Sequence, residues 1–380
     1  MSYVNDNDRH QLYLQRLASG LLKTRVYPSL DEAYRAARLI LLDAGEIRNL
    51  KQLNAILRKV EASAVKITAA ALDEVTKELQ AIAIYEASYY ASLVGGYAGV
   101  ELAVPGAKTI QDFIDIALMS LTSGERVTTG LWSEFIGNQI ASTGAVYNNA
   151  IKTSFVNGES VSQGIKRLRE ATQGLLRREY ETLTRTGLQH YAIQAREAMA
   201  ADNLDILERR YYNTVFDNRR SLLCAGRARK TWLLTDDNYP RLPAHFNCRS
   251  SWIFLLKGQD APTGTMAAVG GKDTERAQEK YDNRAAQTDK KIKYRGKRDT
   301  DMFDPGQISA KTGVDSWLRE QPDWYVRDTL GETRAKLFLD GKLPINSFTD
   351  ATGRTITLKE LVERDAAAFR RAGLTPPTTN

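Results

Sequence analysis

The clearest pattern in this 380-residue chain is one apolar stripe that begins near residue 49. Its hydrophobic positions recur every three or four residues, which is the period of one face of an α-helix. No glycine or proline interrupts the stripe before Gly95 and Gly96. A helix of about forty residues is about 60 Å long and needs a partner helix, so we predict a helical bundle. The stripe consists of Leu53, Ile56, Val60, Ala64, Ile67, Ala71, Val75, Leu79 and Ile82.

Shorter amphipathic segments lie on both sides of this helix. Ser29 and either Ser160 or Ser162 precede two of them, where a serine hydroxyl accepts a hydrogen bond from the first helical turn. The glycine-rich segment 92–107 is interpreted as a buried loop between helices. Residues 1–202 are therefore predicted to form one helical region. The further helices are predicted over 5–22, 29–45, 109–122, 128–156, 160–171 and 175–201.

From Ile206 onward the helical period gives way to residues that favour strands. The predicted strands lie within 207–217, 230–234 and 251–256. We therefore predict a small α+β domain over 203–258. Residues 259–310 are predicted to be a basic linker. Residues 259–289 within it contain few apolar anchors, which is consistent with a linker or a solvated helix. Residues 311–380 return to helical patterns. The predicted fold class is α+β, predominantly α-helical.

The formal charge of +7 and the isoelectric point near 9.2 favour a polyanionic partner. Six cations and no acids occupy the nine positions from 290 to 298. Such a run is often simply solvated, but cations around a tyrosine also suit contacts to nucleic-acid phosphates. Binding of this kind would be independent of base sequence and sensitive to salt. The candidate DNA-contacting residues are Lys290, Lys291, Lys293, Tyr294, Arg295, Lys297 and Arg298.

The polar first residues and the low cysteine content indicate the compartment in which the protein is made. Two cysteines do not make a disulfide framework. The first residues are polar and no signal-peptide pattern follows, so we expect synthesis in a cytoplasm. No run of 18 apolar residues is present, so we expect no stable membrane insertion.

Both cysteines, Cys224 and Cys248, fall with His245 in the irregular segment 214–252. This segment contains Asp-x-Arg-x-Ser-x-x-Cys-x-Gly, and then Pro-x-His-x-Asn-Cys-Arg-Ser. Together the two motifs form the candidate functional site. Their residues are Asp217, Arg219, Ser221, Cys224, Gly226, Pro243, His245, Asn247, Cys248, Arg249 and Ser250.

In two interpretations of these motifs the cysteines are linked to each other, either through a metal ion or by a disulfide bond. Cys224, His245 and Cys248 have the ligand chemistry of a structural zinc site, with Asp217 as the fourth ligand that such a site requires. Apart from this candidate zinc ion we expect no cofactor. Alternatively, a disulfide between the cysteines would stabilise the fold by about 3 kcal/mol through loop closure, although a reducing cytoplasm opposes it.

Two further interpretations leave the thiols free. In a catalytic site, Arg249 would lower the pKa of a thiol and Asp217 would orient His245. In the structural interpretation, which we favour, Asp217 pairs with Arg219 or caps a turn. His245 and Asn247 would then bond the backbone of their own segment, and the thiols would pack as small apolar groups.

The two motifs resemble the signature of the phage Mu protein F-like minor head proteins, also called the head morphogenesis family. The second motif, PAHFNCRS, matches that signature at nearly every position. The first departs from it, because Arg220 stands where threonine is usual and the glycine comes early. In relatives with four cysteines, Ser221 and Ser250 stand where the additional cysteines fall, which weakens the zinc interpretation.

This resemblance implies a minor capsid protein of a tailed bacteriophage, without enzymatic activity, that joins the procapsid near the portal vertex. Its expected partners are the portal protein, the scaffold or major capsid protein, and double-stranded DNA, which it would contact in the head or with which it would be ejected. Its expected location is the virion interior, after assembly in the host cytoplasm. The alternatives are a virion-carried nuclease or transferase that uses His245 and Cys248, and a non-specific DNA-binding factor.

Overall fold

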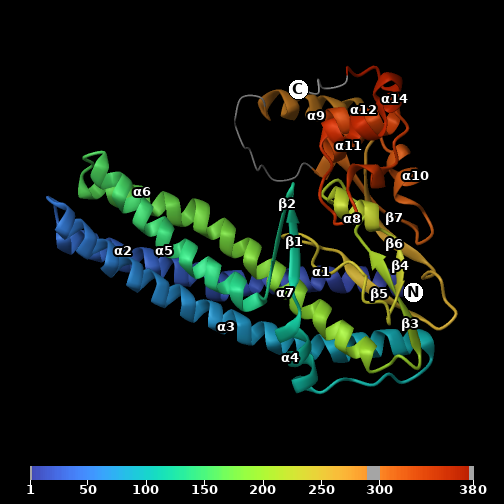
Figure 1. Ribbon diagram of the computed structural model, residues 1–380, viewed down its shortest axis with the longest axis horizontal. Coiled ribbons are helices and arrows are strands. Elements are labelled where there is room, and N and C mark those ends of the chain that lie inside the picture. The colour runs from blue at the N-terminus through green and yellow to red at the C-terminus, as the bar shows by residue number, and fades with distance from the viewer. Residues whose placement is uncertain (1, 289–299, 376–380) are drawn as a thin grey trace.

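The computed structural model of the protein describes residues 2–288 and 300–375. A long bundle of helices extends to one side of a smaller region that contains strands and short helices (Figure 1). The predicted fold class, α+β and predominantly α-helical, is confirmed. We call the bundle of residues 3–201 the helical arm.

The arm begins with two helices that run on as one. Helix α1 (Tyr3–Leu21) passes through a π-helical turn (Leu22–Val26) into α2 (Tyr27–Ala44). The predicted break before Ser29 is therefore wrong, and Ser29 is not a cap, because its hydroxyl donates to the carbonyl of Val26 within the continuous helix. The wider π turn precedes Pro28, which has no N–H to offer the usual helical hydrogen bond.

Helix α3 (Leu50–Ala98) is the long helix that the apolar stripe predicts. The side chain of Asn49 caps it by accepting from the N–H of Gln52 at 2.9 Å. Gly95 does not end the helix. A Cβ there would lie 2.6 Å from the carbonyl oxygen of Val100, so this glycine permits a close approach of the chain. The helix ends at Gly99, which has a φ of 70°.

The segment after α3 is mostly exposed, so its interpretation as a buried loop is wrong. Within 99–106, Leu102 and Pro105 are buried, and the side-chain amide of Asn203 holds the segment through the N–H and carbonyl of Ala103 at 2.8 and 2.9 Å. Residues 119–130, placed in predicted helices and their connection, form an antiparallel hairpin instead. Its tip reaches the C-terminal part of the chain, where the Thr355 N–H donates to the carbonyl of Gly124 at 3.4 Å.

Among the remaining helices of the arm, the one predicted over 128–156 is confirmed from residue 132. The predicted break between residues 171 and 175 is wrong, because the helix that begins at Val161 continues through a π-helical turn to Ala201. Ser160 caps its helix, because its hydroxyl accepts from the N–H of Gln163. Helix α3 packs against α2, α5 and α7 in the bundle core. The elements are α4 (Ala107–Ile116), β1 (Met119–Ser123), β2 (Arg126–Gly130), α5 (Trp132–Val156), α6 (Val161–Ala171), a π-helical turn (Thr172–Leu176) and α7 (Arg177–Ala201).

A glycine allows α7 to approach the start of α5. A Cβ on Gly187 would lie 2.3 Å from Cη2 of the Trp132 indole, which is itself buried. The indole is fixed by its hydrogen bond to the hydroxyl of Thr76 at 3.2 Å and by an edge-on contact with Tyr191. A larger residue at position 187 therefore has to displace a tryptophan.

We expect Gly187→Ala to lower the free energy of unfolding by about 2 kcal/mol, because it overpacks this contact. Gly137→Ala is the matched control, since a Cβ at that position of α5 meets nothing within 4 Å. The control should raise the free energy of unfolding by roughly 0.5–1 kcal/mol through helix propensity. Urea unfolding followed by circular dichroism measures both, and equal effects of the two substitutions would contradict the packing argument.

A buried polar network ties the arm to the strands. Arg196 of α7 is fully buried; its Nε donates to Oε1 of Glu86 at 2.6 Å, and its Nη1 donates to Asn7 at 2.9 Å. His10 contacts the other Glu86 oxygen at 2.5 Å. Burial raises the pKa of Glu86, but Arg196 and His10 outweigh it and hold that pKa below its usual value. Asn7 continues the network to Ser251 at 3.1 Å.

The three predicted strands of the small domain are confirmed. Strand β3 (Leu207–Asn213) lies between β4 (Thr231–Leu233) and β5 (Ser251–Leu256) in an antiparallel sheet. A short helix, α8 (Leu222–Arg227), stands between β3 and β4 in the chain. Buried side chains from α3 and α7 pack against those of this sheet in one cluster, so the sheet rests on the arm.

Residues expected to form a linker contain regular structure. Strand β6 (Thr265–Gly271) pairs with β7 (Phe303–Ser309). Between them in the chain lies α9 (Glu275–Thr288), a mostly exposed helix that agrees with the solvated helix expected within 259–289. The Val269 N–H donates to the carbonyl of Phe216 at 2.7 Å, which joins this ribbon to the loop after β3. The strands escaped prediction because their partner residues are far apart in the sequence and include Pro305 and Gly306.

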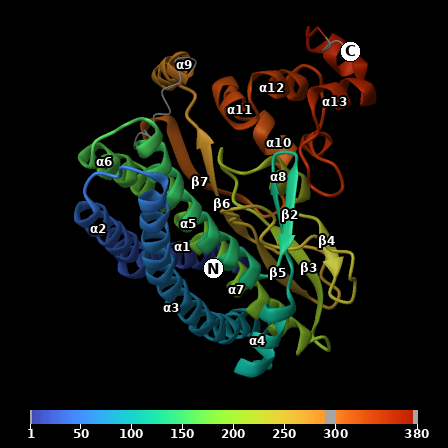
Figure 2. The ribbon, with the colours of Figure 1, turned by 60° about the vertical axis from the view of Figure 1, so that its left-hand side comes forward.

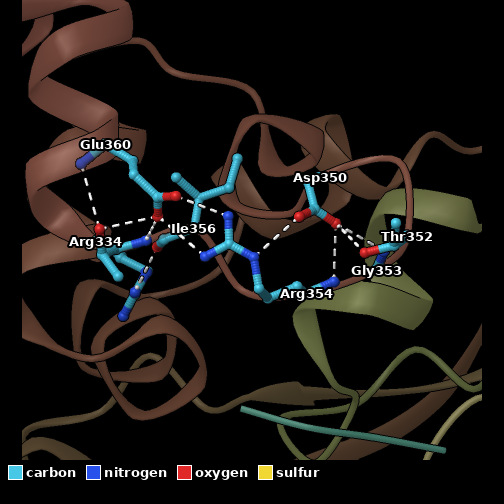
Figure 3. A network of polar contacts seen from close by, with 8 residues as sticks. Arg334, Asp350, Thr352, Gly353, Arg354, Ile356 and Glu360 are labelled. Atoms are coloured by element: carbon cyan, nitrogen blue, oxygen red, sulfur yellow. Dashed lines mark hydrogen bonds and ion pairs between the residues drawn. The ribbon is translucent and has the colours of Figure 1, made fainter. Parts of the chain in front are cut away.

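The predicted return to helices is confirmed within residues 311–375, as five short α-helices. Between them, Arg354 bonds Asp350 at 3.0 Å and Glu360 at 2.6 and 3.2 Å (Figure 3). Glu360 also accepts from the N–H and hydroxyl of Thr357, which caps α13. The helices are α10 (Val314–Arg319), α11 (Asp323–Leu330), α12 (Glu332–Leu339), α13 (Leu358–Arg364) and α14 (Ala366–Arg371).

No helix within residues 2–288 and 300–375 is long and apolar enough to cross a membrane.

Candidate functional site

The two sequence motifs meet where the sheet rests on the arm. The first occupies the loop after β3 and helix α8, and the second occupies the irregular segment 243–250 that leads into β5. In Figure 2 the strands β3–β5 and helix α8 lie beside α7 and the β1–β2 hairpin. Contacts between side chains of the two motifs hold them together.

An ion pair makes the first connection. Asp217 is buried and binds Arg249 through two hydrogen bonds, of 2.7 and 2.9 Å. The same carboxylate accepts from the backbone N–H of Arg219 at 3.0 Å, which confirms the prediction that Asp217 caps a turn. The structure shows that Asp217 forms an ion pair with Arg249 of the second motif, a partner that the sequence did not suggest. Bidentate pairs of this geometry are among the stronger hydrogen-bonded ion pairs.

Two small residues of the first motif position α8. The hydroxyl of Ser221 accepts from the N–H of Cys224 at 3.1 Å and caps the helix. Gly226 lies against a 3₁₀ turn (Ile345–Phe348) of the C-terminal part. A Cβ there would lie 3.2 Å from Oγ1 of Thr349 and 3.4 Å from Cα of Asn346, so these neighbours would have to shift by a few tenths of an ångström to admit a side chain.

The cysteines and the histidine form the second connection. Cys224 Sγ lies 3.1 Å from His245 Nε2 and 3.9 Å from Cys248 Sγ. His245 Nδ1 donates to the carbonyl of Phe246 at 2.9 Å, which confirms the predicted bond of this histidine to its own segment. The Tyr212 hydroxyl of β3 is 3.3 Å from the Cys224 sulfur. Both thiols are buried, and His245 is half-buried.

The surroundings shift the pKa values of the two thiols in opposite directions. Burial raises the pKa of the Cys224 thiol, but its contacts with Cys248 and His245 outweigh this and hold that pKa well below the usual value. Burial and the neighbouring Cys224 raise the pKa of Cys248 well above its usual value. Burial lowers the pKa of His245, but Cys224 outweighs it and raises that pKa. The arrangement therefore favours a thiolate at Cys224 beside a protonated imidazole.

The rest of the second motif shapes the segment itself. Asn247 has a φ of 57°, a left-handed conformation that asparagine adopts more readily than most residues. Its backbone N–H donates to Thr186 of α7 at 3.1 Å, so it docks the segment on the arm. Gln189 of α7 donates to the carbonyl of Ser250 at 2.8 Å. The peptide bond before Pro243 is cis.

Two residues of the site were not singled out from the sequence. Tyr212 is one, since a tyrosine in a strand gives no hint that its hydroxyl faces a thiol. Arg220 is the other: it is buried above the rings of Phe216 and Trp317, at 4.7 and 5.7 Å, and burial lowers its pKa to about 10. Its departure from the threonine of the family pattern was the available signal. The arginine stem fills space between the motif loop and the C-terminal helices.

These contacts bear on the disulfide, catalytic and metal-binding interpretations of the two motifs. The cysteines are not joined in a disulfide. Asp217 does not orient His245, because its carboxylate binds Arg249. Cys224 is 2% exposed, which leaves a substrate little access to its sulfur. Cys224, His245 and Cys248 present ligand atoms within 4.8 Å of one another, and among the residues described this metal-ligating group does not include Asp217.

The candidate DNA-contacting residues, from Lys290 to Arg298, lie outside the described residues. Comparison with protein-family models, with curated proteins and with solved structures finds no match to this chain.

Proposed function

We propose that this protein is a minor head protein of a tailed bacteriophage, built into the procapsid beside the portal. The observation that carries the proposal is the resemblance of the two motifs to the Mu F-like signature. The contacts within the site support it, because Asp217 with Arg249 and Cys224 with His245 each join one motif to the other. These contacts explain why two motifs that are separated in the sequence would occur together: they form one structural unit.

The arm suits the docking role that the proposal gives it. At its end, the connection between α2 and α3 lies beside the connection between α5 and α6 (Figure 1). A groove of about 480 Å³ between them is lined by apolar side chains such as Leu41, Ile151 and Phe155, and by charged ones that include Arg48 and Glu159. Around it, large apolar side chains face outward. They are Leu39, Leu42, Leu50 and Val156, with exposed fractions of 63%, 48%, 66% and 80%.

We therefore place the portal-binding surface at this end of the arm. Apolar contacts of this kind lose little strength as salt rises, whereas contacts to DNA phosphates weaken steeply. Contacts with the scaffold or the major capsid protein, and ejection with the DNA, belong to the same proposal. The location that follows is the virion interior at the portal vertex.

The test is a pull-down of the purified chain with its cognate portal protein, at low and at raised salt, with DNA as competing bait. We expect Leu42→Ser combined with Val156→Ser to weaken portal binding about tenfold or more, since it removes two exposed apolar contacts. Ile116→Ser is the matched control, because Ile116 is 78% exposed at the end of α4. Portal retention that survives raised salt and responds to the double substitution alone would support the proposal.

Retention of DNA alone, and only at low salt, would instead favour a non-specific DNA-binding factor. Neutralising the cations between residues 290 and 298 should then remove most of the affinity and flatten its salt dependence. The enzyme alternative predicts something else again: His245→Ala would leave assembly intact and abolish an activity.

A further inference from the structure

We infer that Cys224, His245 and Cys248 form a zinc-binding site that fastens helix α8 to the turn before β5. This goes beyond the proposed function, which assigns no metal to the protein. The inference rests on where three donor atoms lie, on how one of them is oriented, and on the compartment in which the protein is expected to fold.

The spacing of the donor atoms is that of a tetrahedral metal site. Zinc bonds of about 2.3 Å to sulfur and about 2.0 Å to nitrogen place two sulfur ligands about 3.8 Å apart, and sulfur and nitrogen about 3.6 Å apart. The two sulfurs are 3.9 Å apart, and Cys224 Sγ is 3.1 Å from His245 Nε2. The group as a whole lies within 4.8 Å. Side-chain adjustments of about an ångström would admit the ion, because the 3.1 Å contact has to lengthen and the widest separation has to shorten.

The histidine is held as a ligand would be. Its Nδ1 donates to the carbonyl of Phe246, which fixes the ring and directs Nε2 toward the sulfurs. Metal-ligating histidines commonly show this second hydrogen bond to a backbone carbonyl or a carboxylate. Cys248 reaches the same point because its N–H closes a turn onto the carbonyl of His245 at 3.2 Å. Cys224 arrives from α8, 21 residues earlier than His245.

Thiolate and imidazole ligands select zinc over magnesium and calcium, which prefer oxygen ligands. The three protein ligands leave one position of a tetrahedral site, which a water molecule would fill. A metal link also works in a reducing cytoplasm, where a disulfide between the same sulfurs does not persist. The ion would therefore form a second link between the two motifs, beside the Asp217–Arg249 ion pair.

The test begins with the full chain purified without chelator from zinc-supplemented cells. We expect about one zinc ion per chain by elemental analysis. Chelation should lower the melting temperature by several degrees, and zinc, unlike magnesium, should restore it. Replacing zinc with cobalt should produce thiolate-to-cobalt absorption. A folded chain that carries no zinc and gives no such absorption with cobalt would overturn the inference.

Substitutions separate ligation from simple packing. Cys248→Ser should weaken zinc binding by on the order of 100-fold or more, since it removes a thiolate ligand. Asp217→Asn and Tyr212→Phe are the matched controls: each alters a direct neighbour of the cluster or its ion pair and leaves the three ligands in place. Both should retain the zinc. Loss of zinc in the controls but not in Cys248→Ser would overturn the assignment of ligands. If Cys248→Ser does not fold, the cobalt spectrum of the unsubstituted chain decides alone.

Discussion

Replacing Glu86 with alanine is expected to lower the free energy of unfolding by about 3–5 kcal/mol, the cost typical of leaving one member of a buried ion pair unpaired. Arg196 would be that member. Its side chain is fully buried between α1, α3 and β5, and its guanidinium lies 4.1 Å from the centre of the Tyr90 ring. Asn7 would remain as a neutral partner but would not compensate the charge.

The same helix provides the control. Glu78 of α3 also pairs with an arginine, Arg25, at 3.1 Å, but both side chains are more than 40% exposed. Glu78→Ala should therefore cost about 0–1 kcal/mol. A double substitution, Glu86→Leu with Arg196→Met, should recover much of the loss, because it removes both charges and fills the space. Urea unfolding of the three variants and the unsubstituted protein measures these free energies. Equal losses for Glu86→Ala and Glu78→Ala would show that the Arg196 side chain moves out into solvent when Glu86 is removed.

Stability is also expected to fall by about 3 kcal/mol as pH rises from about 4 to above 6, through Asp8 alone. Burial raises the pKa of this carboxyl from 3.8 to about 6, although Asn213 and the N–H of Ala267 donate to it at 2.7 and 3.3 Å. The folded state thus keeps a proton that the unfolded state has already released. The stability contributed by the protonated form is complete below pH 4 and is lost as pH passes through 6.

Asp8→Asn isolates this contribution. Asparagine does not titrate, so the difference in unfolding free energy between the variant and the natural sequence should shift by about 3 kcal/mol in favour of the variant between pH 4 and pH 7. Any change in hydrogen bonding caused by the amide is the same at both pH values and cancels. Carboxylates with lowered pKa, such as Glu360, titrate in both proteins. A difference that stays constant with pH would refute the buried, protonated Asp8.

The fold could be predicted where one local pattern decides it. The stripe that locates α3 is a property of consecutive residues, and so is the tyrosine-rich segment that becomes β3. The glycines near residue 95 did not locate the end of α3. Composition does not show whether a glycine permits close packing, as Gly95 does, or ends a helix in a left-handed conformation, as Gly99 does. Strands β6 and β7 were missed because each is stabilised by a partner that lies more than thirty residues away.

The candidate site was found from the sequence because cysteine and histidine are rare in this chain. Its internal pairing was not found, since Asp217 and Arg249 are separated by 32 residues while Arg219 stands next but one. The buried network around Glu86 left a signal that could have been used. Glu86 continues the apolar face formed by Leu79 and Ala83, and a carboxylate on such a face predicts a buried cation opposite it.

Translation delivers α1 well before the residues that it binds. Asn7 bonds Ser251, and Asp8 bonds Asn213 and the backbone of Ala267, so the first helix of the chain cannot finish docking until β5 and β6 have been synthesised. A nascent chain that has emerged as far as α7 therefore carries an arm with one helix still incompletely held. We expect a ribosome-released fragment that ends before residue 251 to be digested by protease first within α1, whereas the full chain protects it.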